Sequence, residues 1–181
     1  MEALIELDKN LFIFLNSLGL EMFDSIWLFI TDKKSSIPLY LFLLYYIFKK
    51  NETKIFLKYI IIITLLVLFT DQISVFFKNY FQRLRPCHDL DLDIRLVKEG
   101  CGGLYGFFSS HATNSFGIAT FIYISLYKYS KYFKYVFLWA LIVSYSRIYV
   151  GVHFPMDIVI GIIVGIFSGY LFSLIFNKIR I

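Results

Sequence analysis

Charged residues are scarce in this chain of 181 amino acids, where Asp, Glu, Lys and Arg together make up only 17%. Apolar residues make up 59%, and the mean hydropathy is +0.70. Few soluble proteins of this size could hide so much apolar surface, so the lipid bilayer is the solvent that this composition indicates. The length indicates a single domain over residues 1–181.

The sequence also lacks features that would indicate other classes of protein. It has no low-complexity tract and no internal repeat. Its first residues, MEALIELDKN, are acidic and carry no small-residue cleavage site, so we expect no cleavable secretory signal. The net charge of +5 could suggest nucleic-acid binding, but the basic residues do not gather into one patch. An integral membrane protein that binds no nucleic acid is therefore expected.

Only two cysteines are present, Cys87 and Cys101, and both lie in the one long polar loop, residues 82–108. They could be unrelated thiols, or they could form a disulfide if the loop faces an oxidising compartment. A zinc site with His88 is the weakest alternative. Three ligands would leave the tetrahedron incomplete, and the spacing fits no common zinc pattern.

Five apolar segments are near the length of about 20 residues that a membrane-spanning helix needs. They are residues 24–48, 55–80, 109–127, 133–151 and 154–177. Polar residues interrupt the first of them at positions 32–36. Residues 1–20 mix apolar and acidic side chains at helical spacing, which predicts an amphipathic helix at the membrane surface, with a sixth span as the alternative. The expected fold is an all-α bundle of five to six transmembrane helices.

The charged residues in the connections between these segments differ between the two sides of the membrane. Nine basic residues and the single acid Glu52 lie on one side, a net charge of +8: Lys49, Lys50, Lys54, Lys58, Lys128, Lys131, Lys134, Lys178 and Arg180. The other side holds nine basic and twelve acidic residues, a net charge of −3. The positive-inside rule makes the first side cytoplasmic. We therefore expect a multi-pass protein of the bacterial cytoplasmic membrane whose loop 82–108 faces outward, where a Cys87–Cys101 disulfide could form.

The last segment carries a stripe of small residues. Gly161, Gly165 and Gly169 recur every four residues, which lets another helix approach closely. We expect this stripe to pack within the molecule, and a homodimer face is the alternative.

The outward ends of the spans carry ionisable side chains in three short stretches. The second span ends KNYFQRLRP, which puts Lys78 and Arg85 seven residues apart on one helix face before Pro86 ends the helix. The third span begins FSSHATN, where the N-terminus of a helix is an anion site before any side chain is counted. The fourth and fifth spans meet in SRIYVGVHFPMD, residues 146–157. All three stretches lie on the same side at about the same depth.

Together these groups indicate phosphoryl transfer through a histidine. His153 with Asp157 four residues later has the arrangement of a nucleophile and the carboxylate that orients it. His111, on a facing helix, could protonate the leaving oxygen and later activate water. Three cations suit the oxygens on which charge accumulates in the transition state: Lys78, Arg85 and Arg147. They supply the charge that a metal would bring, so no metal or other cofactor is expected.

Taken singly, each of these groups also has a structural explanation. Lys78 and Arg85 could extend along the interface, as long basic side chains commonly do. Arg147 could pair with Asp157 and have no other role, and His111 could be a helix cap. Ionisable groups at membrane depth are nevertheless functional more often than not, and six at one level favour a site.

In these stretches the chain resembles the type-2 phosphatidic acid phosphatase superfamily, which includes bacterial membrane lipid phosphatases and the soluble vanadium haloperoxidases. The family pattern has three blocks, K-x6-R-P, P-S-G-H and S-R-x5-H-x3-D. The first and third match fully, at 78–86 and 146–157, and the resemblance covers about residues 36–177. The middle block reads FSSH, with Phe108 for the proline and Ser110 for the glycine. We expect Ser110 to donate through its hydroxyl or to tighten the pocket.

The resemblance implies that His153 forms a phosphohistidine intermediate, that Asp157 orients it and that His111 is the acid. It implies phosphate binding by five residues: Lys78, Arg85, Ser109, Ser110 and Arg147. The implied substrate is a membrane lipid, and the candidates are undecaprenyl pyrophosphate, lipid A 1-phosphate, phosphatidylglycerol phosphate and phosphatidate. The alternatives are a lipid phosphotransferase of the same fold, which passes phosphate from a polyprenyl pyrophosphate to another lipid, and a non-catalytic lipid-binding protein.

Overall fold

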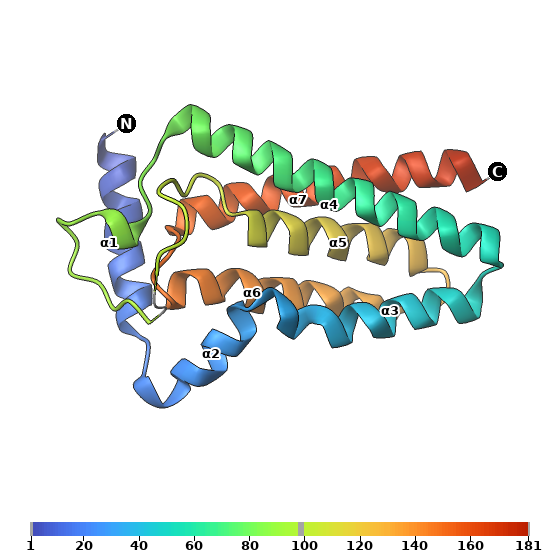
Figure 1. Cartoon of the computed structure of the whole chain (residues 1–181), viewed down its shortest axis with the longest axis horizontal. Helices are drawn as coiled ribbons and strands as arrows, with labels where there is room; N and C mark the ends of the chain where they lie inside the picture. The colour runs from blue at the N-terminus through green and yellow to red at the C-terminus, as the bar shows by residue number, and fades with distance from the viewer. Residues whose placement is uncertain (1, 98–99, 181) are drawn as a thin grey trace.

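The protein is a bundle of helices, seen in a computed structural model that describes residues 2–97 and 100–180 (Figure 1). The described residues form seven α-helices: α1 (Glu2–Ser17), α2 (Asp24–Thr31), α3 (Ile37–Lys50), α4 (Thr53–Phe81), α5 (Ser110–Leu126), α6 (Val136–Tyr149) and α7 (Pro155–Arg180). Short 3-10 helices precede α2, α3 and α6 and follow α4. No β-strand occurs in these ranges, so the expected all-α class is confirmed for the described residues.

Two helices are long and apolar enough to cross a membrane on their own. These are α4, with 29 residues, and the part of α7 from Pro155 to Ile179, with 25. At about 1.5 Å per residue both exceed the thickness of the hydrocarbon core. The pair α1–α2, bent by 83° at its break, adds a third span if the two count as one. The count of five to six spans stays a prediction.

The expected span over residues 24–48 is not one continuous α-helix. It divides into α2 and α3 at the polar stretch that begins with Asp32. The Asp32 carboxylate accepts a hydrogen bond from the Lys34 backbone N–H at 2.9 Å, and the Ser35 hydroxyl donates to the backbone carbonyl of Asp32 at 2.8 Å. Such local hydrogen bonds compete with the helical ladder, so the chain turns there and sets α2 at an angle to α3 (Figure 1).

The N-terminal helix forms as expected and runs across one end of the bundle (Figure 1). Its buried side chains are Asp8, Phe12 and Asn16, spaced four residues apart. Most of its large apolar side chains, Leu7 and Phe14 among them, are exposed instead. The face of α1 that contacts protein thus carries two polar side chains and one aromatic ring; the amphipathic character of this helix and its position at the membrane surface remain predictions.

Helix α5 lies at the centre and packs against α4, α6 and α7. The glycine stripe of α7 makes its closest approach here. A Cβ atom added at Gly165 would lie 2.5 Å from the backbone oxygen of Thr113, and one added at Gly161 would lie 2.9 Å from that of Ser109. The stripe therefore packs within the molecule, as expected. It also fixes the N-terminus of α5 against that of α7.

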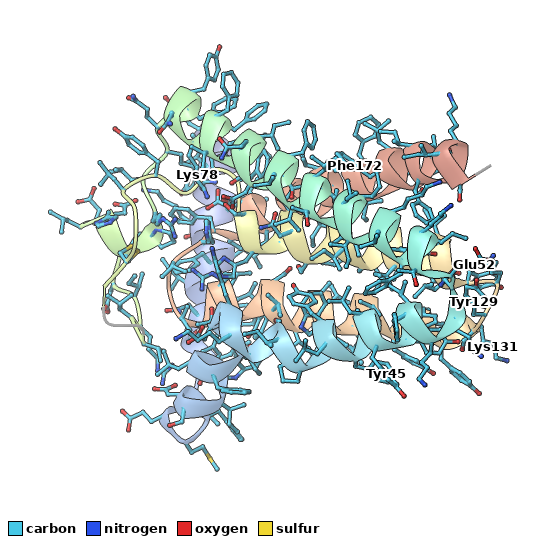
Figure 2. All side chains as sticks on the ribbon, turned by 45° about the vertical axis from the view of Figure 1, so that its right-hand side comes forward. Tyr45, Glu52, Lys78, Tyr129, Lys131 and Phe172 are labelled. Carbon is cyan, nitrogen blue, oxygen red and sulfur yellow. A yellow bond between two sulfur atoms is a disulfide. The ribbon has the colours of Figure 1, made fainter. Side chains whose placement is uncertain are left out.

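The two ends of the bundle differ as the charge pattern predicts. The α3–α4 and α5–α6 joins and the C-terminus lie at one end, and α1 and the loop after α4 lie at the other (Figure 1). Figure 2 shows Glu52 and Lys131 at the first end and Lys78 near the second. The residues assigned to one side of the membrane are therefore together in space. Which side faces the cytoplasm stays a prediction.

Candidate active site

Five segments meet at the α1 end of the bundle and bring together His153, Asp157 and the three expected cations. They are the C-terminus of α4, the loop that follows it, the N-terminus of α5, the C-terminus of α6 and the start of α7. Helix α4 ends at Phe81 because Gln82 adopts a left-handed conformation, with φ 49° and ψ 30°. This turn carries the chain away from the helix axis and over the ends of α5 and α7. The prediction that Lys78 and Arg85 share one helix face up to Pro86 is therefore wrong, since Arg85 lies beyond the helix.

His153 and Asp157 form a buried pair. Their side chains are almost fully shielded from solvent, and His153 Nδ1 lies 3.2 Å from Asp157 Oδ2. A carboxylate can only accept, so Nδ1 carries the proton and donates it. The other ring nitrogen, Nε2, lies 3.4 Å from Arg85 Nη1, and a guanidinium can only donate. The two neighbours therefore fix one tautomer, in which the Nε2 lone pair points at the cations.

The same environment keeps the imidazole neutral. Burial first, and then the Arg85, Arg147, Lys78 and Arg83 cations, hold the pKa of His153 well below its usual range. A neutral imidazole retains the lone pair that a nucleophile needs.

The three expected cations all lie around this histidine. Lys78 donates to the Ser110 hydroxyl at 2.6 Å, and Arg85 Nε donates to the backbone carbonyl of Tyr105 at 3.2 Å. Arg147 Nη1 donates to the Thr31 hydroxyl, while its Nε is buried and has no hydrogen-bond partner among the described residues. A phosphate oxygen would supply the missing acceptor.

The departure from the family pattern has a structural consequence. The Ser110 hydroxyl accepts from Lys78 and lies 2.5 Å from the hydroxyl of Ser74, which in turn donates to the carbonyl of Phe108 at 3.3 Å. Ser110 thus anchors the lysine; its expected role at phosphate, as a hydroxyl donor or by tightening the pocket, stays a prediction. Ser109 caps α5 through its hydroxyl, and its N–H donates to the backbone carbonyl of Asp157 at 3.0 Å.

His111 lines a cavity of about 310 Å³ bounded by α3, α4, α5 and α6 and by residues 30–36. Its lining is largely apolar but includes the polar side chains of Asp32, Asp71 and Asn114, and Ser110 is the other predicted site residue that lines it. A second cavity of about 370 Å³ shares four lining residues with the first and continues along α3, α4 and α5 between almost wholly apolar side chains. Two adjoining cavities with largely apolar linings suit the apolar chains of a lipid.

Two residues that the sequence analysis did not select touch the site. Arg83 Nη1 lies 3.1 Å from Asp157 Oδ1, and Arg83 Nη2 lies 2.6 Å from Asp8 Oδ2. Arg83 falls between the lysine and the arginine of the first block, at a position that the pattern leaves open. Asp8 could have been noticed as an acid on the face of α1 that also carries Phe12 and Asn16.

The loop after α4 covers the site and is closed by a disulfide. Cys87 and Cys101 are bonded, with Cα atoms 5.9 Å apart. The loop then passes over the buried pair, where a Cβ atom at Gly106 would lie only 3.0 Å from Asp157 Oδ2. The two sulfur atoms lie near His88 but bond to each other, so they offer no thiolate to a metal.

Comparisons with known proteins agree with this geometry. The model of the PAP2 superfamily matches residues 55–181. A lipid A 4'-phosphatase of Bacteroides thetaiotaomicron is 36% identical over 99% of this chain and 81% of its own length. A lipid A 4'-phosphatase of Porphyromonas gingivalis is 37% identical over 94% of this chain and 73% of its own length.

Two solved structures are also similar. The crystal structure of Aquifex aeolicus LpxE matches with a TM-score of 0.65 and 27% identity, over 90% of this chain and 92% of that one. The crystal structure of a transmembrane PAP2-type phosphatidylglycerolphosphate phosphatase from Bacillus subtilis matches with a TM-score of 0.78 and 20% identity, over 99% and 89%. At 20% identity, the Bacillus subtilis structure shows similarity of fold alone.

Proposed function

Since this chain belongs to the PAP2 superfamily, it is a membrane lipid phosphatase of the type-2 phosphatidic acid phosphatase class, and we propose that His153 is its nucleophile. The observation that carries this proposal is the fixed tautomer of that histidine. Asp157 accepts the Nδ1 proton, and Nε2 is aimed at the cations that would hold a phosphate. A phosphate oxygen that accepts from Arg85 in place of Nε2 would bring phosphorus within reach of attack by that nitrogen.

The proposed reaction has two steps. Nε2 of His153 attacks phosphorus, the bond from phosphorus to the lipid oxygen breaks, and His111 gives that oxygen a proton. Water then attacks the phosphohistidine, His111 takes a proton from it, and inorganic phosphate leaves. Lys78, Arg85 and Arg147 stabilise the charge on the transferred phosphoryl group in both steps, and Ser109 and Ser110 hold the end of α5 in place.

For the substrate we propose the 4'-phosphate of lipid A. Two relatives named lipid A 4'-phosphatase are 36% and 37% identical to this chain over nearly its whole length. The first cavity supports a sugar head group, because Asp71 and Asn114 offer hydrogen bonds beyond the phosphate itself. A polyprenyl chain has no hydroxyl or amide to meet them, and the apolar cavity suits acyl chains.

We further propose that the site faces outward from the bacterial cytoplasmic membrane. The basic joins at the opposite end of the bundle support this orientation through the positive-inside rule. The disulfide in the loop over the site supports it independently, because structural disulfides persist in oxidising compartments.

The test is phosphate release by the detergent-purified protein from lipid A carrying both phosphates, with chelator present. The released position is read by mass spectrometry, and the other candidate lipids are assayed beside it. We expect the native protein to release the 4'-phosphate. We expect His153→Ala to lower the rate of release at least about 10³-fold. His88→Ala is the matched control, since that histidine lies in the loop outside the site.

Two results would contradict parts of the proposal. Activity that survives His153→Ala would exclude this residue as the nucleophile. Faster release from phosphatidylglycerol phosphate, phosphatidate, undecaprenyl pyrophosphate or the lipid A 1-position would leave the mechanism intact and change the substrate. Transfer of label to a second lipid without free phosphate would identify the phosphotransferase.

A further inference from the structure

Arg83 binds two carboxylates at once. Its Nη1 donates to Asp157 Oδ1 at 3.1 Å and its Nη2 to Asp8 Oδ2 at 2.6 Å. The guanidinium also stacks over the ring of Phe154, with Cζ 4.2 Å from the ring centroid. Both terminal nitrogens and one face of the group are therefore engaged, and the side chain is held in one position.

Asp157 has a different partner on each of its two oxygens. Oδ1 accepts from Arg83, and Oδ2 accepts from His153 Nδ1 and from the Phe154 backbone N–H at 3.1 Å. The side chain has no exposed surface, so water cannot replace a lost partner. Removal of Arg83 would leave Oδ1 unpaired and the carboxylate held through Oδ2 alone. The acceptor that orients His153 would then be positioned less firmly.

Asp8 extends this chain of contacts to the N-terminal helix. Its Oδ2 holds Arg83, and its Oδ1 accepts from the Met156 backbone N–H at 2.8 Å, so one carboxylate joins α1 to both the arginine and the start of α7. Asp8 is itself buried, at 8% exposed. Removing a buried carboxylate with charged and backbone partners is destabilising, because the Met156 N–H loses its acceptor and Arg83 loses one of its two carboxylates.

We propose that Arg83 is a positioning residue for the Asp157–His153 pair and that Asp8 holds Arg83 in place. Helix α1 thus contributes to the geometry of the active site through Asp8. This inference rests on the proposed role of His153 as the nucleophile. It goes beyond the family blocks, because Arg83 occupies an open position of the first block and α1 lies outside residues 55–181, which the family model matches.

The alternative role for Arg83 is a fourth phosphate ligand. The geometry argues against it, because both terminal nitrogens already donate to carboxylates. The two roles also predict different kinetics. A phosphate ligand that is removed raises KM and weakens inhibition by inorganic phosphate. A positioning residue that is removed lowers kcat and leaves both constants nearly unchanged, because substrate still binds while the nucleophile is misplaced.

The experiment is a double-mutant cycle with the purified full-length protein. Arg83→Gln is made in the native background and in Asp157→Asn, and phosphate release is measured with inhibition by inorganic phosphate. We expect Arg83→Gln to lower kcat about 30- to 100-fold in the native background, by analogy with the loss from a misplacement of 1 Å. In the Asp157→Asn background we expect a further loss of less than about threefold, because the group through which Arg83 acts has changed.

Asp8→Asn tests the link to α1. It keeps the size of the side chain and weakens its bond to Arg83, so we expect kcat to fall about 5- to 10-fold with KM unchanged. Arg83→Lys, which can reach one carboxylate but not both, should restore part of the activity that Arg83→Gln loses. The matched control is Asp89→Asn, since Asp89 pairs with Lys9 of α1 at 2.7 Å, whereas the ion pairs of Arg83 are with Asp8 and Asp157. This control should stay within about twofold of the native rate.

Each outcome decides between the two roles. Equal losses from Arg83→Gln in both backgrounds, or a weaker affinity for inorganic phosphate, would make Arg83 a phosphate ligand and overturn the proposal. Native kcat in both Arg83→Gln and Asp8→Asn would also overturn it, while an inactive His153→Ala in the same assay would leave the proposed function standing. If Arg83→Gln does not fold, Arg83→Lys and Asp8→Asn still carry the test.

Discussion

The close approach of α7 to α5 makes Gly165→Ala a sharp test of the fold and its link to activity. A Cβ atom there would lie 2.5 Å from the Thr113 oxygen and 3.1 Å from both Gly117 N and Phe116 Cβ. An ordinary carbon–oxygen contact is about 3.3 Å or longer, so the helices must separate by nearly 1 Å. Overpacking of this kind costs about 1–3 kcal/mol, or a lowering of Tm by about 4–8 °C for 2 kcal/mol in a protein of this size.

The same separation should lower activity, because α5 and α7 carry opposite halves of the site at their N-termini. A displacement of 1 Å can reduce the rate by about 100-fold, so we expect Gly161→Ala, nearest the site, to lose more activity than Gly165→Ala. Tm follows from thermal unfolding in detergent, and kcat from phosphate release. Gly103→Ala is the control, since its Cβ would meet nothing within 4 Å. Native Tm and kcat in Gly165→Ala, with loss only of an oligomer, would refute this account and identify the stripe as a dimer face.

Three further predictions follow from the site and its orientation. Because the pKa of His153 is held below its usual range, the acidic limb of the pH–rate profile should have its midpoint below about 6.5; a midpoint of that limb at or above 6.5 would contradict this. In intact cells a membrane-impermeant maleimide should label Leu90→Cys, because this position is fully exposed in the loop. It should label Tyr132→Cys only after permeabilisation. The reverse pattern would show that the loop faces the cytoplasm. Reduction of the disulfide, or Cys87→Ser with Cys101→Ser, should lower kcat about 10-fold. The reason is that the same loop carries the carbonyls of Leu104 and Tyr105, which accept hydrogen bonds from Arg85. Unchanged activity would show that the loop keeps its shape without the bond.

The composition and three spaced blocks were sufficient to predict the helical class and the cluster of charges at one end of the bundle. The spacing of four between His153 and Asp157 predicted their contact, although His153 precedes α7 and the Asp157 side chain reaches back to it from the first turn. The stripe of glycines likewise predicted a close helix contact within the molecule. In each case a local pattern fixes the geometry directly.

The contacts that sequence analysis did not find are non-local. Arg83 meets Asp157 across 74 residues and Asp8 across 75, and no helical period relates such distant positions. The break between α2 and α3 was visible as polar residues, but its angle depends on hydrogen bonds around Asp32 that composition does not reveal. The hydrogen bond from Lys78 to Ser110 was also not predicted, because the pattern relates both residues to phosphate and does not relate them to each other.

The central claim is that phosphate passes through His153, and trapping the intermediate tests it most directly. The protein is mixed with substrate labelled with ³²P at the 4'-phosphate, quenched within milliseconds in alkaline denaturant and digested. We predict label that is stable to base and labile to acid, on the peptide that contains His153, and none in His153→Ala. Label on a different residue, or turnover at the native rate by His153→Ala, would contradict the claim.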